Sequence, residues 1–362
     1  MRKSEYGSDF VEKEPITAKK GMFQGECIHD YLLGRTALDA IVQDAIMEYG
    51  IKTVLLPSYC CHTMIHPFVK RGLQIRFYDI VPAKGGGIRY CIDWEQHFDA
   101  LLIMQYFGFH QEDVFDIIDR LKDKKKVIIE DATHSLLQPN PYSRKSNYVF
   151  ASYRKWMATN GGAIVIKREG WMREGADIVT DEQDIRDRYL AVKTKAIAEK
   201  KQYFTEKCNT EKTYRQFFHE AEQIIETQYA GFEIDNESRE CIYNTDYERM
   251  KIIRQTNAKY LVEGLRAVPQ IHLLFHDVTD KDVPLFVPIC METTKRQSLR
   301  QYLIEHNIFL PIHWPLSELH NITEKGKQLF ENELSIICDQ RYDIEDMDYI
   351  ISMIKRWENA YE

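Results

Sequence analysis

Residues 34–166 alternate between helix-like segments and short apolar segments, and this alternation constrains the fold more than any other feature of the sequence. Residues 34–50 and 114–125 carry apolar side chains at helical spacing, whereas the apolar runs between them have the length of strands. Because a strand–helix–strand rhythm pairs its strands in parallel, we expect a large three-layer α/β domain with a mainly parallel sheet. In such sheets the functional residues gather where the strands end.

The chain has 362 residues, which is enough for more than one lobe, since single cores stop growing at about 250–300 residues. Charge rises between about 171 and 240, and the spacing there indicates a helical insertion that is either solvated or an oligomer contact. Beyond it, a long helical pattern and further apolar runs predict a smaller α/β domain. We therefore expect a large domain over 1–244, with the insertion inside it, and a small C-terminal domain over 245–362.

The overall charge and the cysteine spacing exclude several classes of protein. The formal net charge is -8 and no basic block is interleaved with aromatic residues, so nucleic acid is not an expected partner. No apolar run approaches the roughly 20 residues of a membrane span, and the first residues lack the apolar segment of a signal peptide. Eight cysteines without paired spacing are typical of reduced thiols, and we expect a soluble, cytoplasmic protein.

Polar residues with complementary chemistry follow the predicted strands. Asp131 ends the apolar run at 128–131, His134 comes three residues later, and Ser152 ends the next run with Lys155 just beyond. Gly34-Arg35-Thr36 opens the first helix, where free backbone N–H groups form a site for phosphate. Taken singly, these residues have plainer interpretations: a helix cap or metal ligand at Asp131, a core histidine at His134, a cap at Ser152 and a solvated lysine at Lys155.

Pyridoxal 5'-phosphate uses all of these groups together. It requires a lysine for its covalent attachment, a carboxylate that keeps its ring nitrogen protonated, and a phosphate site made of amides and hydroxyls. These groups follow one another along the chain as an anion site, an acid with a histidine, a lysine and a Gly-Gly pair. This order favours the cofactor over a separate structural role for each residue. The sequence therefore predicts a pyridoxal-phosphate enzyme.

The sequence resembles the DegT/StrS aminotransferases, the sugar-modifying branch of the fold-type I pyridoxal-phosphate enzymes. The resemblance runs through most of the chain and is most specific at EDATH with its downstream serine and lysine. The segments that carry it are GRTALDAI, LPSYCCHTMIHPFVKRGLQIRFYDI, EDATH, ASYRKWMATNGGAIV and, more loosely, RQYLIEHNIFLPIHWP.

The resemblance implies a role for each matching residue. Lys155 would hold the cofactor and move the proton at the substrate α-carbon, Asp131 would pair with the ring nitrogen, and His134 would lie beside the ring. Ser152 and the amides that follow Gly34, those of Arg35 and Thr36, would bind the phosphate. The family works as homodimers with active sites shared between subunits, so we expect the partner chain to supply some ligands.

Two positions depart from the family pattern. The common spacing places the lysine five residues after the serine, whereas Lys155 follows Ser152 by three, with Arg154 between them; a similar Arg-Lys loop occurs in a divergent branch. At Cys61 many members carry an aromatic residue that stacks on the cofactor, and Tyr59 or His62 would be its substitute here. If neither residue takes this place, the stacking contact with the cofactor ring is lost.

Three further signals have mainly structural interpretations. Cys60, Cys61, His62 and His66 suggest a metal site, but consecutive side chains do not converge on one ion, and we predict no metal. The run KGGGIRY at 84–90 lacks the spacing of a dinucleotide fingerprint and predicts a turn or hairpin. His313 and Trp314 lie in an apolar, strand-like stretch, where they either pack in the core or line a substrate pocket suited to a sugar or a base.

These observations favour an aminotransferase that moves an amino group from an amino acid, expected to be glutamate, to a nucleotide-linked keto-sugar in polysaccharide or secondary-metabolite biosynthesis. A sugar dehydratase is an alternative that keeps the cofactor, although the family's dehydratase has a histidine in place of the lysine. A second alternative is a degenerate member that serves as a binding or scaffold subunit.

Overall fold

The computed structural model describes residues 3–15, 28–173, 182–205 and 212–361. These residues form two compact units, which are considered separately. Unit 1 consists of Met1–Ser8, Ile51–Asn147 and Tyr247–Glu362, and unit 2 consists of Asp9–Gly50 and Tyr148–Asp246. One break between the units falls at Asp246–Tyr247, close to the expected domain boundary at residue 245, and the expected division into 1–244 and 245–362 stays a prediction.

Unit 1 contains a mainly parallel run of strands, as the alternating pattern predicts. Its strands follow the order β7-β6-β3-β4-β5, in which β7, β6, β3 and β4 are parallel and β5 is antiparallel to β4. The elements are β3 (Thr53–Pro57), α2 (His62–Lys70), β4 (Gln74–Pro82), β5 (Ile88–Cys91), β6 (Ala100–Met104), α3 (Glu112–Lys122) and β7 (Val127–Asp131). Strands β3, β6 and β7 are buried throughout, because strands inside a parallel sheet are covered on both faces.

The glycine run at 84–90 forms the hairpin that its composition predicts. Gly85, Gly86 and Gly87 all have positive φ, and β5 pairs back onto β4 immediately after them. A Cβ atom on Gly86 would lie 3.0 Å from the ring of His276, so a side chain there would have to displace the histidine.

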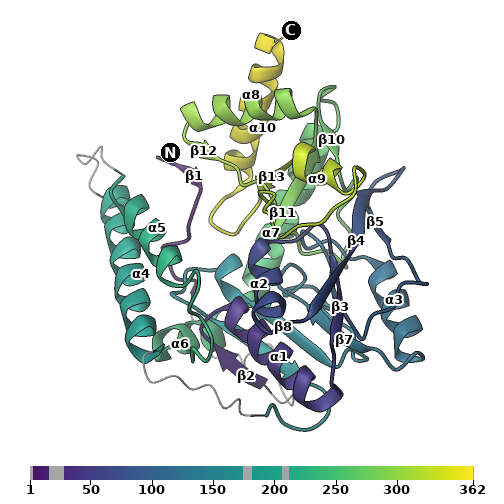
Figure 1. Cartoon of the computed structure of the whole chain (residues 1–362). Coiled ribbons are helices and arrows are strands. Elements are labelled where there is room, and N and C mark those ends of the chain that lie inside the picture. Colours follow the sequence, from purple (N-terminus) through teal and green to yellow (C-terminus); the bar gives the residue numbers. More distant parts are fainter. Residues whose placement is uncertain (1–2, 16–27, 174–181, 206–211, 362) are drawn as a thin grey trace. The chain divides into compact units, whose positions relative to one another are not determined.

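The rest of unit 1 surrounds an antiparallel sheet in the order β10-β11-β13 (Figure 1). Tyr6 of the short strand β1 belongs to the same apolar core, and β1 pairs with β12. The elements are β1 (Tyr6–Gly7), α7 (Tyr247–Leu265), β10 (His272–Leu273), β11 (Phe286–Cys290), α8 (Thr293–Glu305), β12 (Ile308–Phe309), α9 (Lys327–Asn332), β13 (Glu333–Ile337) and α10 (Ile344–Tyr361).

The apolar stretch at 308–315 is a strand over only its first two residues. β12 ends at Phe309, and the segment that carries His313 and Trp314 has irregular backbone with a cis peptide bond between these two residues. Pro311 has no N–H to donate to a neighbouring strand, which explains why the apolar pattern overstates the strand.

Unit 2 packs one helix on three strands in the order β2-β9-β8 and adds the predicted helical insertion. Helix α1 contacts all three strands, and α4 and α5 run side by side (Figure 1). The elements are β2 (Ile28–Tyr31), α1 (Gly34–Tyr49), β8 (Tyr148–Ser152), the 3-10 turn η1 (Tyr153–Lys155), β9 (Ala163–Lys167), α4 (Glu182–Thr205), α5 (Tyr214–Ile224) and α6 (Asn236–Asn244). Over the described part of the chain, none of the helices is both long and apolar enough to cross a membrane.

Candidate functional site

Lys155 lies on the turn η1, directly after the buried strand β8. The turn is anchored by the next residue, Trp156, whose side chain is fully buried, whereas Lys155 itself is exposed. Tyr153 N–H donates to the carbonyl oxygen of Gly162 at 3.0 Å and thereby closes the loop. The neighbours of Lys155 are thus buried or hydrogen-bonded, whereas Lys155 itself is exposed, and its role in holding a cofactor stays a prediction.

The Gly-Gly pair after the lysine loop allows a close backbone approach. Gly162 has a φ of +117° and donates its N–H to the carbonyl oxygen of Leu32 at 2.6 Å. A Cβ atom on Gly161 would lie 2.6 Å from that same oxygen. Larger residues would push β9 away from the segment that leads into α1, so the pair serves the geometry of the loop.

Ser152 faces the start of helix α1. A Cβ atom on Gly34 would lie 3.2 Å from Ser152 Cβ and 3.7 Å from Ser152 Oγ, so the missing side chain leaves room beside the hydroxyl. The first helical hydrogen bond runs from Ala37 N–H to Leu33 O, which leaves the amides of residues 34–36 outside the helical ladder. The N-cap residue Leu33 supplies no side-chain cap. A hydroxyl and an uncapped helix N-terminus are the elements of a phosphate site.

The side chains of Arg35 and Thr36 contact the chain that follows α5. The Arg35 guanidinium donates to the carbonyl oxygens of Ile225 at 2.9 Å and Glu226 at 2.8 Å, and Thr36 Oγ1 donates to Tyr229 O at 2.6 Å. These side chains therefore hold the helix start in place. Their predicted contribution to phosphate binding is through the backbone amides.

Residues of the insertion contact the lysine turn, and no local pattern in the sequence predicts these contacts. Arg154 donates to Tyr189 Oη at 3.0 Å and to Glu222 Oε1 at 2.9 Å, and Tyr189 Oη donates to Asn160 O at 2.7 Å. Burial opposes ionisation of Glu222, but the charges of Arg154, Lys193 and Lys155 outweigh it and lower the pKa of Glu222 to about 2. Glu222 is therefore ionised at neutral pH beside the lysine turn.

Asp131 and His134 lie at the carboxyl end of β7 in unit 1. Both are buried, and Asp131 Oδ1 accepts a hydrogen bond from Thr133 N–H at 2.8 Å. His134 Nδ1 accepts a hydrogen bond from Phe107 N–H at 3.1 Å. Because a backbone N–H can only donate, Nδ1 carries no proton, and the ring proton of neutral His134 is on Nε2.

The rings of His134, His313 and Trp314 lie together in unit 1. Trp314 stacks on His134 at 5.6 Å between centroids, and His313 meets His134 edge-on at 5.9 Å. Tyr59 packs against Trp314 at 5.1 Å and is fully buried. Cys61 is the N-cap of α2, where its Sγ accepts a hydrogen bond from Thr63 Oγ1 at 3.1 Å. The predicted substrate residues thus belong to one aromatic cluster with His134.

Two residues linked to His313 were not anticipated from the sequence. His313 Nδ1 lies 2.8 Å from Ser335 Oγ, and His313 N–H donates to Glu333 Oε2 at 2.8 Å. Alternation along β13 places Glu333 and Ser335 on the same face of the strand. Nothing in the local pattern ELSII links them to a histidine twenty residues earlier.

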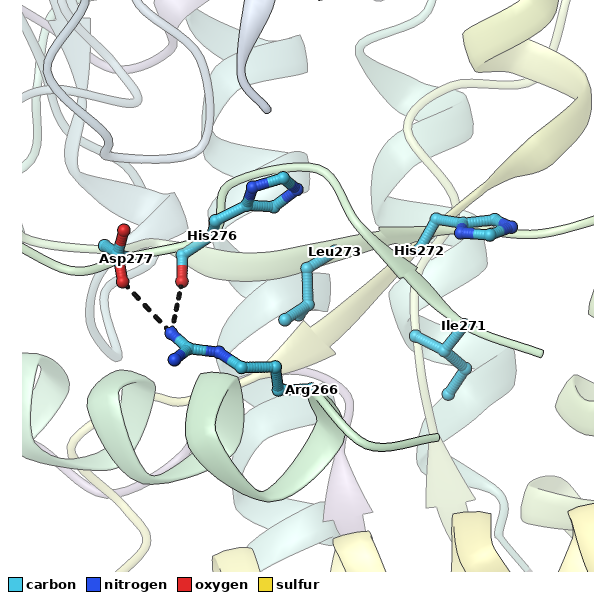
Figure 2. Close-up of a pocket in the computed structure, with 6 residues that line it drawn as sticks. All are labelled: Arg266, Ile271, His272, Leu273, His276 and Asp277. Carbon is cyan, nitrogen blue, oxygen red and sulfur yellow. Dashed lines mark hydrogen bonds and ion pairs between the residues drawn. The ribbon is translucent and has the colours of Figure 1, made fainter. Parts of the chain in front are cut away.

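A pocket of about 380 Å³ lies elsewhere in unit 1, beside the end of α7 (Figure 2). The Arg266 side chain donates there to His276 O and to Asp277 Oδ1, both at 3.0 Å (Figure 2). None of the predicted site residues lines it. Over the described ranges, no group of three or more His, Cys, Asp or Glu side chains is arranged to hold a metal ion.

Comparison with known proteins identifies the fold. No protein-family model and no curated protein matches the sequence. Among solved structures, the aminotransferase PseC of Helicobacter pylori, described as involved in pseudoaminic acid biosynthesis, is similar with 13% identity and a TM-score of 0.64, over 98% of this chain and 100% of that one. The putative sugar aminotransferase Spr1654 of Streptococcus pneumoniae, in its PMP form, is similar with 14% identity and a TM-score of 0.64, over 97% and 98%.

A DegT DnrJ EryC1 StrS aminotransferase from Brucella abortus is also similar, with 15% identity, a TM-score of 0.61, and coverage of 92% of this chain and 86% of that one. The chain therefore shares the fold of these aminotransferases, and the α/β class with a mainly parallel sheet that was expected from the sequence is confirmed.

The residues present fit pyridoxal phosphate. Unit 2 offers an accessible lysine three residues after a serine hydroxyl, which itself faces the uncapped helix start at a glycine. Unit 1 offers a buried carboxylate and a neutral histidine. The predicted residues are Gly34, Arg35, Thr36, Ser152 and Lys155 in unit 2, and Tyr59, Cys61, Asp131, His134, His313 and Trp314 in unit 1.

Proposed function

We propose that the protein is a pyridoxal-phosphate-dependent aminotransferase that transfers an amino group from an amino acid to a nucleotide-linked keto-sugar. The proposed amino donor is glutamate. The observation that carries the proposal is the apposition of Ser152 to Gly34 at the uncapped start of α1, with Lys155 exposed on the turn three residues later. The fold shared with sugar aminotransferases supports it.

The cofactor would supply an aldehyde that bonds to amines and a protonated ring that withdraws electrons from the reacting carbon. Lys155 would bind that aldehyde and move a proton at the α-carbon of the amino acid and later of the acceptor. Asp131 would hold the proton on the ring nitrogen, and His134 would lie against the ring. Ser152 and the first amides of α1 would bind the phosphate.

The cellular role proposed here follows from the acceptor. A keto-sugar attached to a nucleotide belongs to polysaccharide or secondary-metabolite biosynthesis in the cytoplasm, which agrees with the expected reduced thiols. We further propose a homodimer whose partner chain supplies part of each site. His313 and Trp314 would line the acceptor pocket, where flat apolar rings suit a sugar or a base.

The test is the visible absorbance spectrum of the purified chain with added pyridoxal phosphate, before and after glutamate. We expect wild type to develop a visible band that glutamate converts to a near-ultraviolet band, and Lys155→Ala to lose this response. Lys145→Ala is the control, because Lys145 is exposed and pairs with the exposed Asp119.

Two outcomes would favour the alternatives. Failure of wild type to take up the cofactor would overturn the enzyme assignment and favour a scaffold subunit. Uptake without any response to amino acids, together with loss of a hydroxyl from the sugar, would favour a dehydratase, although Lys155 occupies the place where the family's dehydratase has a histidine.

A further inference from the structure

A carboxylate, a hydroxyl and an imidazole form a continuous hydrogen-bonded chain in unit 1. Glu333 and Ser335 have no exposed surface. Ser335 Oγ donates to Glu333 Oε1, and it lies 2.8 Å from His313 Nδ1. Glu333 Oε2 accepts a hydrogen bond from the backbone N–H of His313 at 2.8 Å. One oxygen of the Glu333 carboxylate therefore contacts His313, and the other contacts Ser335.

The proton count along this chain fixes the tautomer of His313. An ionised carboxylate only accepts hydrogen bonds, so the single hydroxyl proton of Ser335 is used toward Glu333. The contact between Ser335 Oγ and His313 Nδ1 then requires a proton on Nδ1. A neutral His313 therefore has its lone pair on Nε2.

The buried side chain of Arg296 lies beside Glu333 and contacts its backbone. The Arg296 side chain is buried and donates to the carbonyl oxygens of Phe330 at 2.8 Å and Glu333 at 3.3 Å. Burial lowers the pKa of Arg296, and the negative charge of Glu333 acts against that change.

The ring of His313 lies in the aromatic cluster with His134. Phe286 approaches it at 4.8 Å and Phe107 at 5.6 Å between centroids, and 12% of the His313 side chain is exposed. His134 carries its proton on Nε2, since Nδ1 accepts from Phe107 N–H. In their neutral forms, these two imidazoles 5.9 Å apart thus have opposite tautomers: His134 has a proton at Nε2, and His313 has a lone pair there.

We propose that Glu333 and Ser335 are positioning residues that hold His313 in the Nδ1–H tautomer, so that Nε2 of His313 accepts a hydrogen bond from a hydroxyl group of the substrate. The hydroxylated substrate rests on the function proposed above, whereas the tautomer does not depend on it. Glu333 and Ser335 thereby favour a sugar-like acceptor, because a hydroxyl group can donate a hydrogen bond to the lone pair on Nε2 of His313 and an apolar group cannot.

The tautomer is tested by nitrogen-15 NMR of the full-length chain with labelled histidine, without substrate. We expect the wild-type His313 resonance to be that of an Nδ1–H ring, and Ser335→Ala and Glu333→Gln to shift it toward the Nε2–H form. Glu130→Gln is a matched control, because Glu130 is also buried and accepts from the Ser146 hydroxyl at 2.7 Å and from Ser143 N–H at 2.9 Å. An Nε2–H ring in wild type would overturn the proposal without any variant.

The substrate contact is tested with the loaded enzyme. Ser335→Ala is expected to raise KM for the hydroxylated acceptor by about tenfold and to leave the half-reaction with glutamate unchanged. Acceptor analogues that each lack one hydroxyl should reveal one for which wild type and Ser335→Ala have equal KM. An unchanged KM despite a changed tautomer would overturn the proposed substrate contact. Failure to bind the cofactor would overturn the proposed function, whereas the NMR measurement would still test the tautomer of His313.

Discussion

A single missing side chain leaves space between the start of α1 and Ser152, where we propose that the phosphate binds. Gly34 adopts ordinary helical geometry, so its requirement is for space, because a Cβ there would lie 3.2 Å from Ser152 Cβ. Alanine has a higher helix propensity than glycine, but an alanine at this position would displace the side chain of Ser152. The proposed phosphate site would therefore explain why glycine occupies this position.

Gly34→Ala is expected to weaken binding of pyridoxal phosphate by roughly tenfold, because the new methyl group moves the Ser152 hydroxyl away from the helix start. Binding of pyridoxal, which lacks the phosphate, serves as the control and should be unchanged. Absorbance titration with both compounds measures the two affinities. An equal loss for both compounds would mean that the substitution acts away from the phosphate.

The insertion helices α4 and α5 act as a support for the lysine turn. Tyr189 of α4 contacts both Arg154 before the lysine and Asn160 after it, and Glu222 of α5 pairs with Arg154. The lowered pKa of Glu222 means that this pairing contributes stability above the usual glutamate pKa of 4.5 and loses it as the pH falls toward about 2. The pairing is therefore intact throughout the physiological pH range.

Glu222→Gln is expected to raise the rate of hydrogen exchange severalfold over residues 153–160, because Arg154 loses its charged partner and the turn opens more often. Exchange measured by mass spectrometry on the full chain gives this readout without cofactor. Glu220→Gln is the matched control on the same helix, since Glu220 and Arg188 lie 3.9 Å apart with both side chains exposed. Equal exchange in the two variants would show that the insertion does not restrain the turn.

At the scale of the whole chain, residues near its two ends share one core. Tyr6 packs among residues of α7 to α10, and its hydroxyl donates to Asp346 Oδ1 at 3.0 Å. Arg341 joins this contact by pairing with both oxygens of Asp339 and by donating to Ser8 O at 3.1 Å. Burial disfavours the charged form of Asp339, but Arg341 outweighs it and lowers the pKa of Asp339 below its usual 3.8.

Asp339→Asn is expected to lower the free energy of unfolding near pH 7 by about 1–3 kcal/mol, through loss of the charged hydrogen bonds. Because the folded-state pKa is depressed, wild type keeps this contribution above the unfolded pKa and loses it as the pH falls through the lower folded value. The variant should therefore lose stability less steeply between about pH 5 and pH 2. Urea unfolding across that range measures both effects, with the exposed Asp280→Asn as control; parallel curves would contradict the prediction.

Local patterns predicted the elements that carry the candidate site. The apolar composition and length of the runs at 128–131 and 148–152 predicted strands that end at Asp131 and Ser152, and helical spacing predicted the start of α1 at Gly34. The same reasoning overstated the strand at 308–315, where Pro311 interrupts the ladder. It also missed the short strand β2, whose half-buried residues show no apolar run.

By itself, the sequence determined the α/β class, the strand ends and the glycines at the helix start and the lysine loop, because each depends on the spacing of side chains within a few residues. Only the tertiary structure decided that Glu222 pairs with Arg154 and that Glu333 and Ser335 lie within hydrogen-bonding distance of His313. The contact between Ser335 and His313 joins residues 22 positions apart, and that between Arg154 and Glu222 joins residues 68 positions apart. Local periodicity carries no information about which distant side chains meet. The packing of the elements supplies that information, and with it the charges and tautomers on which the chemistry depends.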